Sequence, residues 1–438
     1  MKGSPPWTRT FSSLRIVPYR TFYIGQGISL IGTWARTAAM GWLAFQLTHS
    51  RFWLGVVFTL NTLPPLFLSA YAGSLADRLP RLRIFKATTW FALVSSLLVA
   101  GLDFAGLLNF TLLAVFSTLW GLALAFEMPA RQSLMIELVG SGELVNALSL
   151  NSAMLNFARV AGPFLGAFLM AKAGTSWCFL LDAVSFLAVA YALSRIKLPG
   201  PIPRRAGRKG GTLEVVRYVL QNPRLARPLA LLLVMGVGGW SYVSQLSAFT
   251  VENLGGGAGD YGWILAMAGV GSCLCALILA TGGRPWIRES LLYGGVGLFS
   301  FFIFGFGFQH RVLPAALLLF GAAFGFTLFF SPTNSLLQIQ TPDAMRGRVM
   351  GLWAAIFGGG MPIGSFAMGW AAAQVGSGVA LQLGGLFCLG GTLLVVWIFR
   401  ERKKGKAFSP RSPFDSRRSL RVERKPKTGG NNARAQNK

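Results

Sequence analysis

The stretch Gly73-Ser-Leu-Ala-Asp77-Arg78-Leu-Pro80-Arg81-Leu-Arg83 connects two long apolar segments of the chain. Gly73 lies near the end of the first segment, where the absence of a side chain permits close helix packing. Asp77 begins the connection, and arginines follow it at 78, 81 and 83. This arrangement predicts a short charged turn between two membrane-spanning helices.

The composition favours an integral membrane protein. Of the 438 residues, 53% are hydrophobic and only 13% are charged, and the mean hydropathy is +0.53. Soluble globular proteins average roughly 25% charged residues. A compact water-soluble enzyme is therefore disfavoured. The chain also lacks a glycine-rich loop with Lys-Ser or Lys-Thr that would bind ATP, so direct use of ATP is disfavoured.

Twelve apolar stretches have the roughly 20 residues that a membrane-crossing helix needs. Six precede a polar interval and six follow it, which predicts an all-α integral membrane fold of two six-helix bundles. The stretches cover 21–46, 53–76, 84–107, 109–128, 145–170, 176–195, 226–250, 259–281, 288–309, 312–334, 345–371 and 376–399.

The predicted domain boundaries follow from this pattern. We expect an N-terminal bundle over 1–195, a basic linker over 196–225, a C-terminal bundle over 226–400 and a basic tail over 401–438. Within the linker, the apolar residues of Thr212–Gln221 predict a short amphipathic helix on the membrane surface. The tail has few large apolar groups and is predicted to be disordered.

The distribution of positive charge predicts the orientation. Lys and Arg number 41 against 14 Asp and Glu, which gives a net charge of +27. In a soluble protein this surplus would suggest nucleic-acid binding. Here the loops on one side carry only Arg51, Lys172 and Arg311, whereas both termini, the linker and the opposite loops carry nearly all of the rest. Because Lys and Arg concentrate on the cytoplasmic side, we expect both termini in the cytoplasm and no nucleic-acid partner.

The linker and the tail have a second expected role. Their positive charge would attract the anionic lipids of the inner leaflet. The alternative for the tail is a specific protein partner.

The two halves of the chain resemble each other at an offset of 202 residues, the difference between 364 and 162. Gly162 corresponds to Gly364, and Ala171-x-x-Gly174 corresponds to Ala373-x-x-Gly376. Because six spans separate the copies, both have the same orientation in the membrane. This predicts parallel repeats with a substrate site between them at mid-depth.

The connection at 73–83 resembles the loop signature of the major facilitator superfamily, G-x-L-A-D-R-x-G-R followed by a basic residue. Three other segments resemble the bacterial efflux branch that contains the enterobactin exporter: Pro129-Ala-Arg131-Gln, Asn156-Phe-Ala-Arg159-Val-Ala-Gly162-Pro163 and Thr341-Pro-Asp343-x-x-Arg346-Gly-Arg348-Val. The resemblance covers residues 15–400 and implies an alternating-access transporter of a bacterial inner membrane. Pro80 and Leu82 depart from the loop signature, which implies a stiffer loop.

The resemblance also implies a gate on the cytoplasmic side, formed by Gly73, Asp77, Arg78, Arg81 and Glu127. In the superfamily the aspartate at the position of Asp77 faces the start of the eleventh span, where a helix N-terminus attracts negative charge. Arg81 is expected to pair with Glu127. These contacts would form only while the cytoplasmic side is closed. The alternative is a turn that carries positive charge without a gating role.

Polar residues recur at helical spacing on two predicted helices and form candidate walls of a substrate cavity. On the first span they are Gln26, Ser29, Thr33 and Arg36, and on the fifth span they are Ser149, Ser152, Asn156 and Arg159. A ridge of small residues beside the latter suits close helix packing and contains Gly162, Pro163 and Gly166. The C-terminal half adds Trp240, Tyr242, Gln245, Asn334 and Gln338.

Three charged residues within the predicted spans require compensation. A charged arginine at mid-membrane is costly and must face water or a partner. Arg36 and Arg159 are therefore expected to bind an anionic or polyhydroxyl substrate, and the alternative is that helix-end carbonyls satisfy them. Asp182 is the coupling candidate, as a proton carrier. Its alternative is a structural ion pair with Arg159.

We expect a monomeric transporter that exports a small organic molecule, such as a siderophore or a drug-like compound, by proton antiport. The four cysteines and two histidines lack the spacing of a metal site, so no metal or cofactor is expected. The alternatives are a lipid or lysolipid flippase and a non-transporting membrane scaffold or sensor.

Overall fold

The computed structural model describes residues 11–196, 212–282 and 289–405, apart from some side chains within these ranges. The described residues up to Val396 form one compact unit, and those from Trp397 onward form a second unit. Within the described ranges every regular element is helical. A helical fold suits a lipid bilayer, because a helix satisfies its backbone hydrogen bonds without a partner strand and can therefore cross the hydrocarbon interior.

The helices follow the predicted spans closely. The first half contains η1 (Ser12–Arg15), α2 (Val17–Thr48), α3 (Arg51–Arg78), α4 (Arg81–Phe104), α5 (Phe110–Ala173) and α6 (Thr175–Arg195). The second half contains α7 (Thr212–Gln221), α8 (Pro223–Val234), η2 (Met235–Gly239), η3 (Ser241–Gln245), α9 (Leu246–Glu252), α10 (Ala258–Gly282), α11 (Glu289–Phe306), α12 (Val312–Gln340), α13 (Asp343–Val375) and α14 (Ser377–Gly405).

Eleven segments of the described ranges are long and apolar enough to cross a membrane. Helix α2 is not among them. Its 32 residues are sufficient in length, but they include Arg20, Gln26 and Arg36. The prediction of an all-α, multi-span membrane protein is confirmed, whereas twelve spans in two six-helix bundles remain a prediction.

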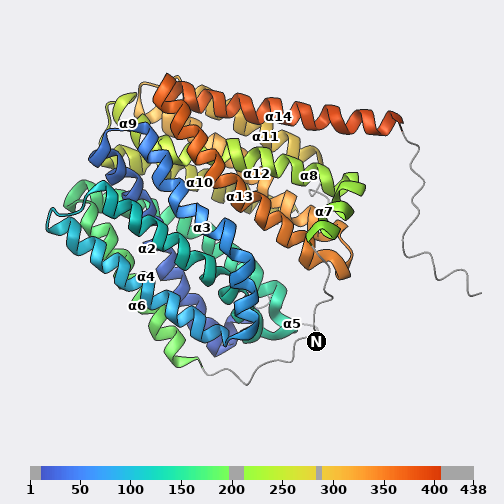
Figure 1. The fold of residues 1–438 in the computed structure, drawn as a ribbon, viewed down its shortest axis with the longest axis horizontal. Helices are drawn as coiled ribbons and strands as arrows, with labels where there is room; N and C mark the ends of the chain where they lie inside the picture. Colours follow the sequence, from blue (N-terminus) through green and yellow to red (C-terminus); the bar gives the residue numbers. More distant parts are fainter. Residues whose placement is uncertain (1–10, 197–211, 283–288, 406–438) are drawn as a thin grey trace, which may run out of the picture. The chain divides into compact units, whose positions relative to one another are not determined.

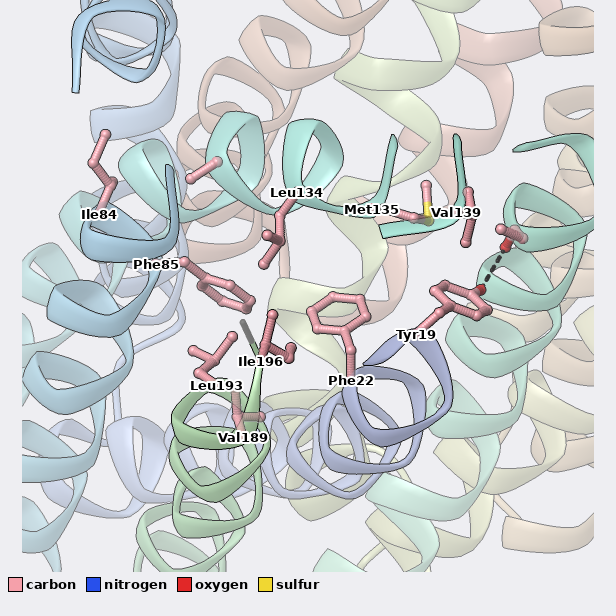
Figure 2. Packing of buried hydrophobic residues seen from close by; sticks show 12 residues of the cluster. Tyr19, Phe22, Ile84, Phe85, Leu134, Met135, Val139, Val189, Leu193 and Ile196 are labelled. Carbon is pink, nitrogen blue, oxygen red and sulfur yellow. Dashed lines mark hydrogen bonds between the residues drawn. The ribbon is translucent and has the colours of Figure 1, made fainter. Parts of the chain in front are cut away.

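Helix α5 joins the predicted fourth and fifth spans. The fourth span was expected to end at residue 128, but the helix continues to Gly140, where a φ of 67° interrupts it. The extension buries Leu134, Met135 and Val139 in an apolar cluster with residues of α2, α4 and α6 (Figure 2). The helix is therefore longer than the predicted span, because its apolar face beyond residue 128 packs against other helices.

The predicted span 226–250 is interrupted. Helix α8 ends at Val234, and the π-helix η2 and the 3-10 helix η3 follow before α9 begins. Glycines at 236, 238 and 239 weaken an α-helix here. Short π-helical turns inside helices occur frequently at functional sites.

Two helix pairs provide most of the contact between the two halves. Helices α2, α4 and α6 lie side by side in the first half (Figure 1), and α10, α11 and α12 pack together in the second. Between the halves, α3 packs against α13 and α5 packs against α10. Next to these contacts, Arg159 of α5 lies 5.4 Å from the ring of Trp240, the residue between η2 and η3.

The sequence repeat corresponds to repeated local structure. Gly174 ends α5 with φ 98° and ψ 174°, and Gly376 ends α13 with φ 90° and ψ 156°. Only glycine adopts such angles without strain, which explains why both copies have it. Gly162 and Gly364 are also equivalent, since each allows its helix to lie directly against a helix of the same half.

Helix α7 has the bounds that the sequence predicted for an amphipathic helix. Its Val215 and Val219 are buried, and the helix packs against α8 and α13. Glu214 of α7 lies 3.2 Å from Arg348 of α13. This part of its apolar face is therefore covered by protein, and a position on the membrane surface remains a prediction. The rest of the predicted linker, 197–211, and most of the tail, 406–438, lie outside the described residues.

Candidate functional site

A cavity of about 60 Å³ lies between the two halves. Its wall includes Trp34 of α2, Arg159 and Pro163 of α5, and Trp240 and Tyr242 of the interrupted segment. A cavity of this volume holds a few water molecules, whereas sites for organic ligands occupy roughly 300–1,000 Å³. In this conformation the cavity next to Arg159 is therefore too small for an organic ligand.

Arg159 lies between two indole rings. Its guanidinium carbon is 5.5 Å from the ring centroid of Trp34 and 5.4 Å from that of Trp240. Both distances are within the range of cation–π attraction. Among the described residues Arg159 forms no ion pair, and its buried Nε has no hydrogen-bond partner. Because rings compensate a buried charge only in part, the guanidinium remains available to an anion.

Arg36 has a different environment from Arg159. Its Nε lies 2.8 Å from Oδ2 of Asp182, and its guanidinium carbon lies 4.0 Å from the ring centroid of Trp120. The carboxylate of Asp182 accepts hydrogen bonds from the hydroxyl groups of Ser96 at 2.6 Å and of Thr33 at 3.2 Å. This network joins α2, α4, α5 and α6 inside the first half.

These contacts correct two predicted locations and one predicted partner. Arg36 and Thr33 were expected at the substrate cavity, but both are directed toward α6, where the carboxylate of Asp182 compensates the buried guanidinium. The structural partner of Asp182 is Arg36 and not Arg159. Gln26, on the same helix as Arg36, is 3% exposed, and its Oε1 has no hydrogen-bond partner among the described residues.

Three other candidates are not among the residues that line the cavity. Gln245 is fully buried and donates a hydrogen bond to the carbonyl of Arg51 at 3.2 Å. Asn334 accepts a hydrogen bond from Gln338 on the same helix at 2.5 Å. Asn156 is half-buried on α5, one turn before the cavity-lining arginine.

The small residues of α5 lie against α2. A side chain at Gly162 would meet Ile31 and Trp34, and one at Gly166 would meet Ala35. The ridge therefore sets the distance between the two helices that present the cavity wall. Trp34 lines the cavity, but sequence analysis did not identify it as a cavity residue.

The structure describes only part of the predicted cytoplasmic gate. Gly73, Asp77 and Arg78 belong to the last two turns of α3, and their side chains lie outside the described residues. Arg81 is the first residue of α4.

The expected partner of Arg81 was wrong. Arg81 pairs with Glu137, whereas Glu127 lies 3.2 Å from Arg131, four residues further along α5. Glu137 belongs to the helical extension beyond residue 128 that the sequence did not predict, so it was not considered as a partner.

Sequence analysis also missed a polar contact between the halves. Arg51, the first residue of α3, lies 2.7 Å from Glu252 at the end of α9, and it donates a hydrogen bond to the carbonyl of Ala372 at 3.3 Å. Ser377 donates to the same glutamate at 3.3 Å. These contacts join α3, α9, α13 and α14. The sequence signal was weak, since each charge is isolated between apolar segments.

The arrangement suits the binding of a ligand and not the formation or cleavage of covalent bonds. Among the described residues there is no group of three or more His, Cys, Asp or Glu that could hold a metal ion. The cavity instead offers one cation, several aromatic rings and a break in the facing helix.

Comparison with known families identifies the class. Residues 8–429 match the family described as transmembrane secretion effector. The chain belongs to this family of major facilitator transporters. It is therefore a multi-pass membrane transporter of small organic molecules and not an enzyme, and the resemblance inferred from the loop at 73–83 is confirmed.

Two curated relatives of this transmembrane secretion effector cover nearly the whole chain. The staphyloferrin A transporter of Staphylococcus aureus is 24% identical over 387 residues, which cover 87% of this chain and 96% of the relative. The enterobactin exporter EntS of Shigella boydii serotype 18 is 29% identical over 416 residues, which cover 90% of this chain and 96% of the relative.

Solved structures share the fold. A bacterial homologue of the human lysosomal transporter Spinster, in an inward-facing and unoccupied conformation, aligns with a TM-score of 0.71 and 14% identity, over 93% of this chain and all of the other. The nucleoside transporter NupG aligns with a TM-score of 0.67 and 13% identity, over 89% of this chain.

Proposed function

We propose that this transporter exports a small anionic organic molecule of the siderophore type by alternating access. The observation that carries the proposal is Arg159, a cation between Trp34 and Trp240 that has no anionic partner among the described residues. A planar guanidinium binds a carboxylate or a catecholate through paired hydrogen bonds. The activities of the two relatives, enterobactin export and staphyloferrin A transport, support this class of substrate.

Flux into proteoliposomes tests the proposal. Vesicles that contain the purified protein should take up enterobactin or staphyloferrin A in a saturable manner when a pH gradient is imposed. Arg159→Lys should raise the apparent KM about tenfold, because the charge remains but the planar fork is lost, and Arg159→Ala should raise it further. Arg195→Lys, at an exposed site on α6, is the matched control. An unchanged KM in Arg159→Ala would exclude this arginine from substrate binding.

The same vesicles separate the rival functions. A flippase would move a fluorescent phospholipid between leaflets without siderophore uptake. A scaffold or sensor would give neither signal.

The proposed cycle uses two gates and a proton. One gate is the Arg51–Glu252 contact, and the other is the motif of Asp77 on the opposite side. Protonation of Asp182 would remove its charge and free Arg36, which is the proposed coupling step. Asp77→Asn should slow flux more than it lowers protein abundance, and an unchanged ratio of inward to outward states in cross-linking would leave Asp77 as a simple turn residue.

The proposed setting is a bacterial inner membrane, with a monomer whose termini are cytoplasmic. Two six-helix bundles, 1–195 and 226–400, would move about the site, and the linker and tail would contact anionic lipids. A reporter active only in the cytoplasm should work when it is fused after residue 210 or after residue 430, and should fail after residue 310. An active reporter after residue 310 would show that the orientation in the membrane is the opposite one.

A further inference from the structure

Five aromatic residues form a continuous surface that begins at the cavity wall, here named the aromatic wall. The ring of Trp240 lies 5.5 Å from Phe326 and 6.0 Å from Phe357. Phe326 stacks on Phe330 at 5.7 Å with an interplanar angle of 17°. Trp353 lies 5.1 Å from Phe330 and stacks on Phe357 at 6.2 Å with an angle of 20°.

The aromatic wall is open in part. Trp240 and Phe326 line the cavity, whereas Phe330, Trp353 and Phe357 are each half-buried. The rings come from three elements of the second half: the junction of η2 and η3, α12 and α13. Flat surfaces of this kind bind other rings by offset stacking or by edge-to-face contact. If the five rings formed a closed hydrophobic core, three of them would not be partly exposed.

Trp353 also carries an unused hydrogen-bond donor. Its Nε1 atom is shielded from solvent, and no acceptor among the described residues lies within hydrogen-bond distance. A buried indole N–H normally finds a partner, because leaving it unpaired is unfavourable. The donor therefore suits an oxygen atom that a ligand brings to the aromatic wall.

We propose that the aromatic wall is a subsite for an aromatic ring that bears an oxygen, and that Trp353 donates to this oxygen. The inference rests on the proposed role of Arg159 as the anion-binding group, since Trp240 touches both the guanidinium and the wall. Together they select a substrate with an anionic group and a hydroxylated aromatic ring. An aliphatic polycarboxylate would engage Arg159 alone.

Binding measurements on the purified full chain in detergent test the subsite. The probes are salicylate, which has a ring, a hydroxyl group and a carboxylate, and citrate, which has carboxylates but no ring. Isothermal titration calorimetry should give tighter binding of salicylate than of citrate. Trp353→Phe keeps a ring and removes the donor, so it should weaken salicylate binding about 3- to 10-fold, the effect of one hydrogen bond. Citrate binding should not change.

A matched control lies on the same helix. Trp370 of α13 is 58% exposed and outside the aromatic wall, so Trp370→Phe should leave both probes unaffected. Phe330→Leu, which removes a ring without changing polarity, should also weaken salicylate selectively. Melting temperatures of all variants identify any loss of binding that follows from unfolding.

The two hypotheses fail in different ways. Equal binding of salicylate and citrate, with no effect of Trp353→Phe, would overturn the aromatic subsite and leave the role of Arg159 intact. Unchanged binding and flux in Arg159→Ala would overturn the proposed function. Weaker binding of both probes in Trp353→Phe at an unchanged melting temperature would also overturn the subsite, because the effect would not depend on the ring.

Discussion

The Nε atom of Arg36 lies 2.8 Å from Oδ2 of Asp182, and this ion pair connects α2 to α6 in the interior of the first half. The side chains are 10% and 0% exposed, so neither charge is solvated well. The hydroxyl groups of Ser96 and Thr33 also donate hydrogen bonds to the carboxylate. An arginine that is paired in this way is structural in this conformation, whereas Arg159 is free to bind.

Asp182→Asn should therefore destabilise the protein strongly. The variant keeps the shape of the side chain but leaves the Arg36 charge without compensation, at a cost of roughly 3–5 kcal/mol. Thermal unfolding in detergent measures the loss. The control is Glu214→Gln, which breaks the contact with Arg348 at a side chain that is 60% exposed. That change should cost less than about 1 kcal/mol, and equal losses would contradict the burial argument.

The contact of Arg51 with Glu252 should break during transport. If it closes one side of the transporter, a covalent link at these positions should arrest the cycle. We expect the double variant Arg51→Cys with Glu252→Cys, with the four native cysteines replaced by alanine, to lose flux after treatment with a short thiol cross-linker. A reductant should restore it. Each single cysteine variant is a control, and continued flux in fully cross-linked protein would exclude a gate here.

Two positions on α2 should differ in access to water. Thr37 lines the cavity, whereas Ser29 is 2% exposed and lies within the first half. In the same cysteine-free background, Thr37→Cys should react with a membrane-impermeant thiol reagent, and Ser29→Cys should not. The reagent can be applied to either side of sealed vesicles, which also reports the open side. Labelling of Ser29→Cys alone would reverse the assignment of the two faces.

The contact of α5 with α10 should tolerate little added volume. A side chain at Gly262 would collide with Ala167, whereas one at Gly259 would come no closer than 3.7 Å to Ala171. Gly262→Ala should separate the helices and disfavour this conformation, because overpacking a tight contact typically costs about 1–3 kcal/mol. Gly259→Ala should behave like the natural protein. Cross-linking of the Arg51 and Glu252 positions measures the shift, and equal yields in both variants would contradict it.

Properties that depend on local sequence were predictable. The thickness of a bilayer sets the length of each apolar run, so the all-α, multi-span membrane class is readable along the chain. The glycines at 174 and 376 also follow from local backbone geometry, because φ values of 98° and 90° strongly favour glycine. The motif at 73–83 was sufficient for the superfamily.

Only the tertiary structure decided which residues meet. Helical periodicity places Arg36 on one face of α2, but the rotation of that helix determines whether the face meets Asp182 or the cavity. Arg81 meets Glu137 because α5 continues beyond the membrane-length run, and Arg51 meets Glu252 because 201 residues of chain return to the same end. Such contacts depend on the packing of several helices at once, and spacing within one helix contains no information about its neighbours.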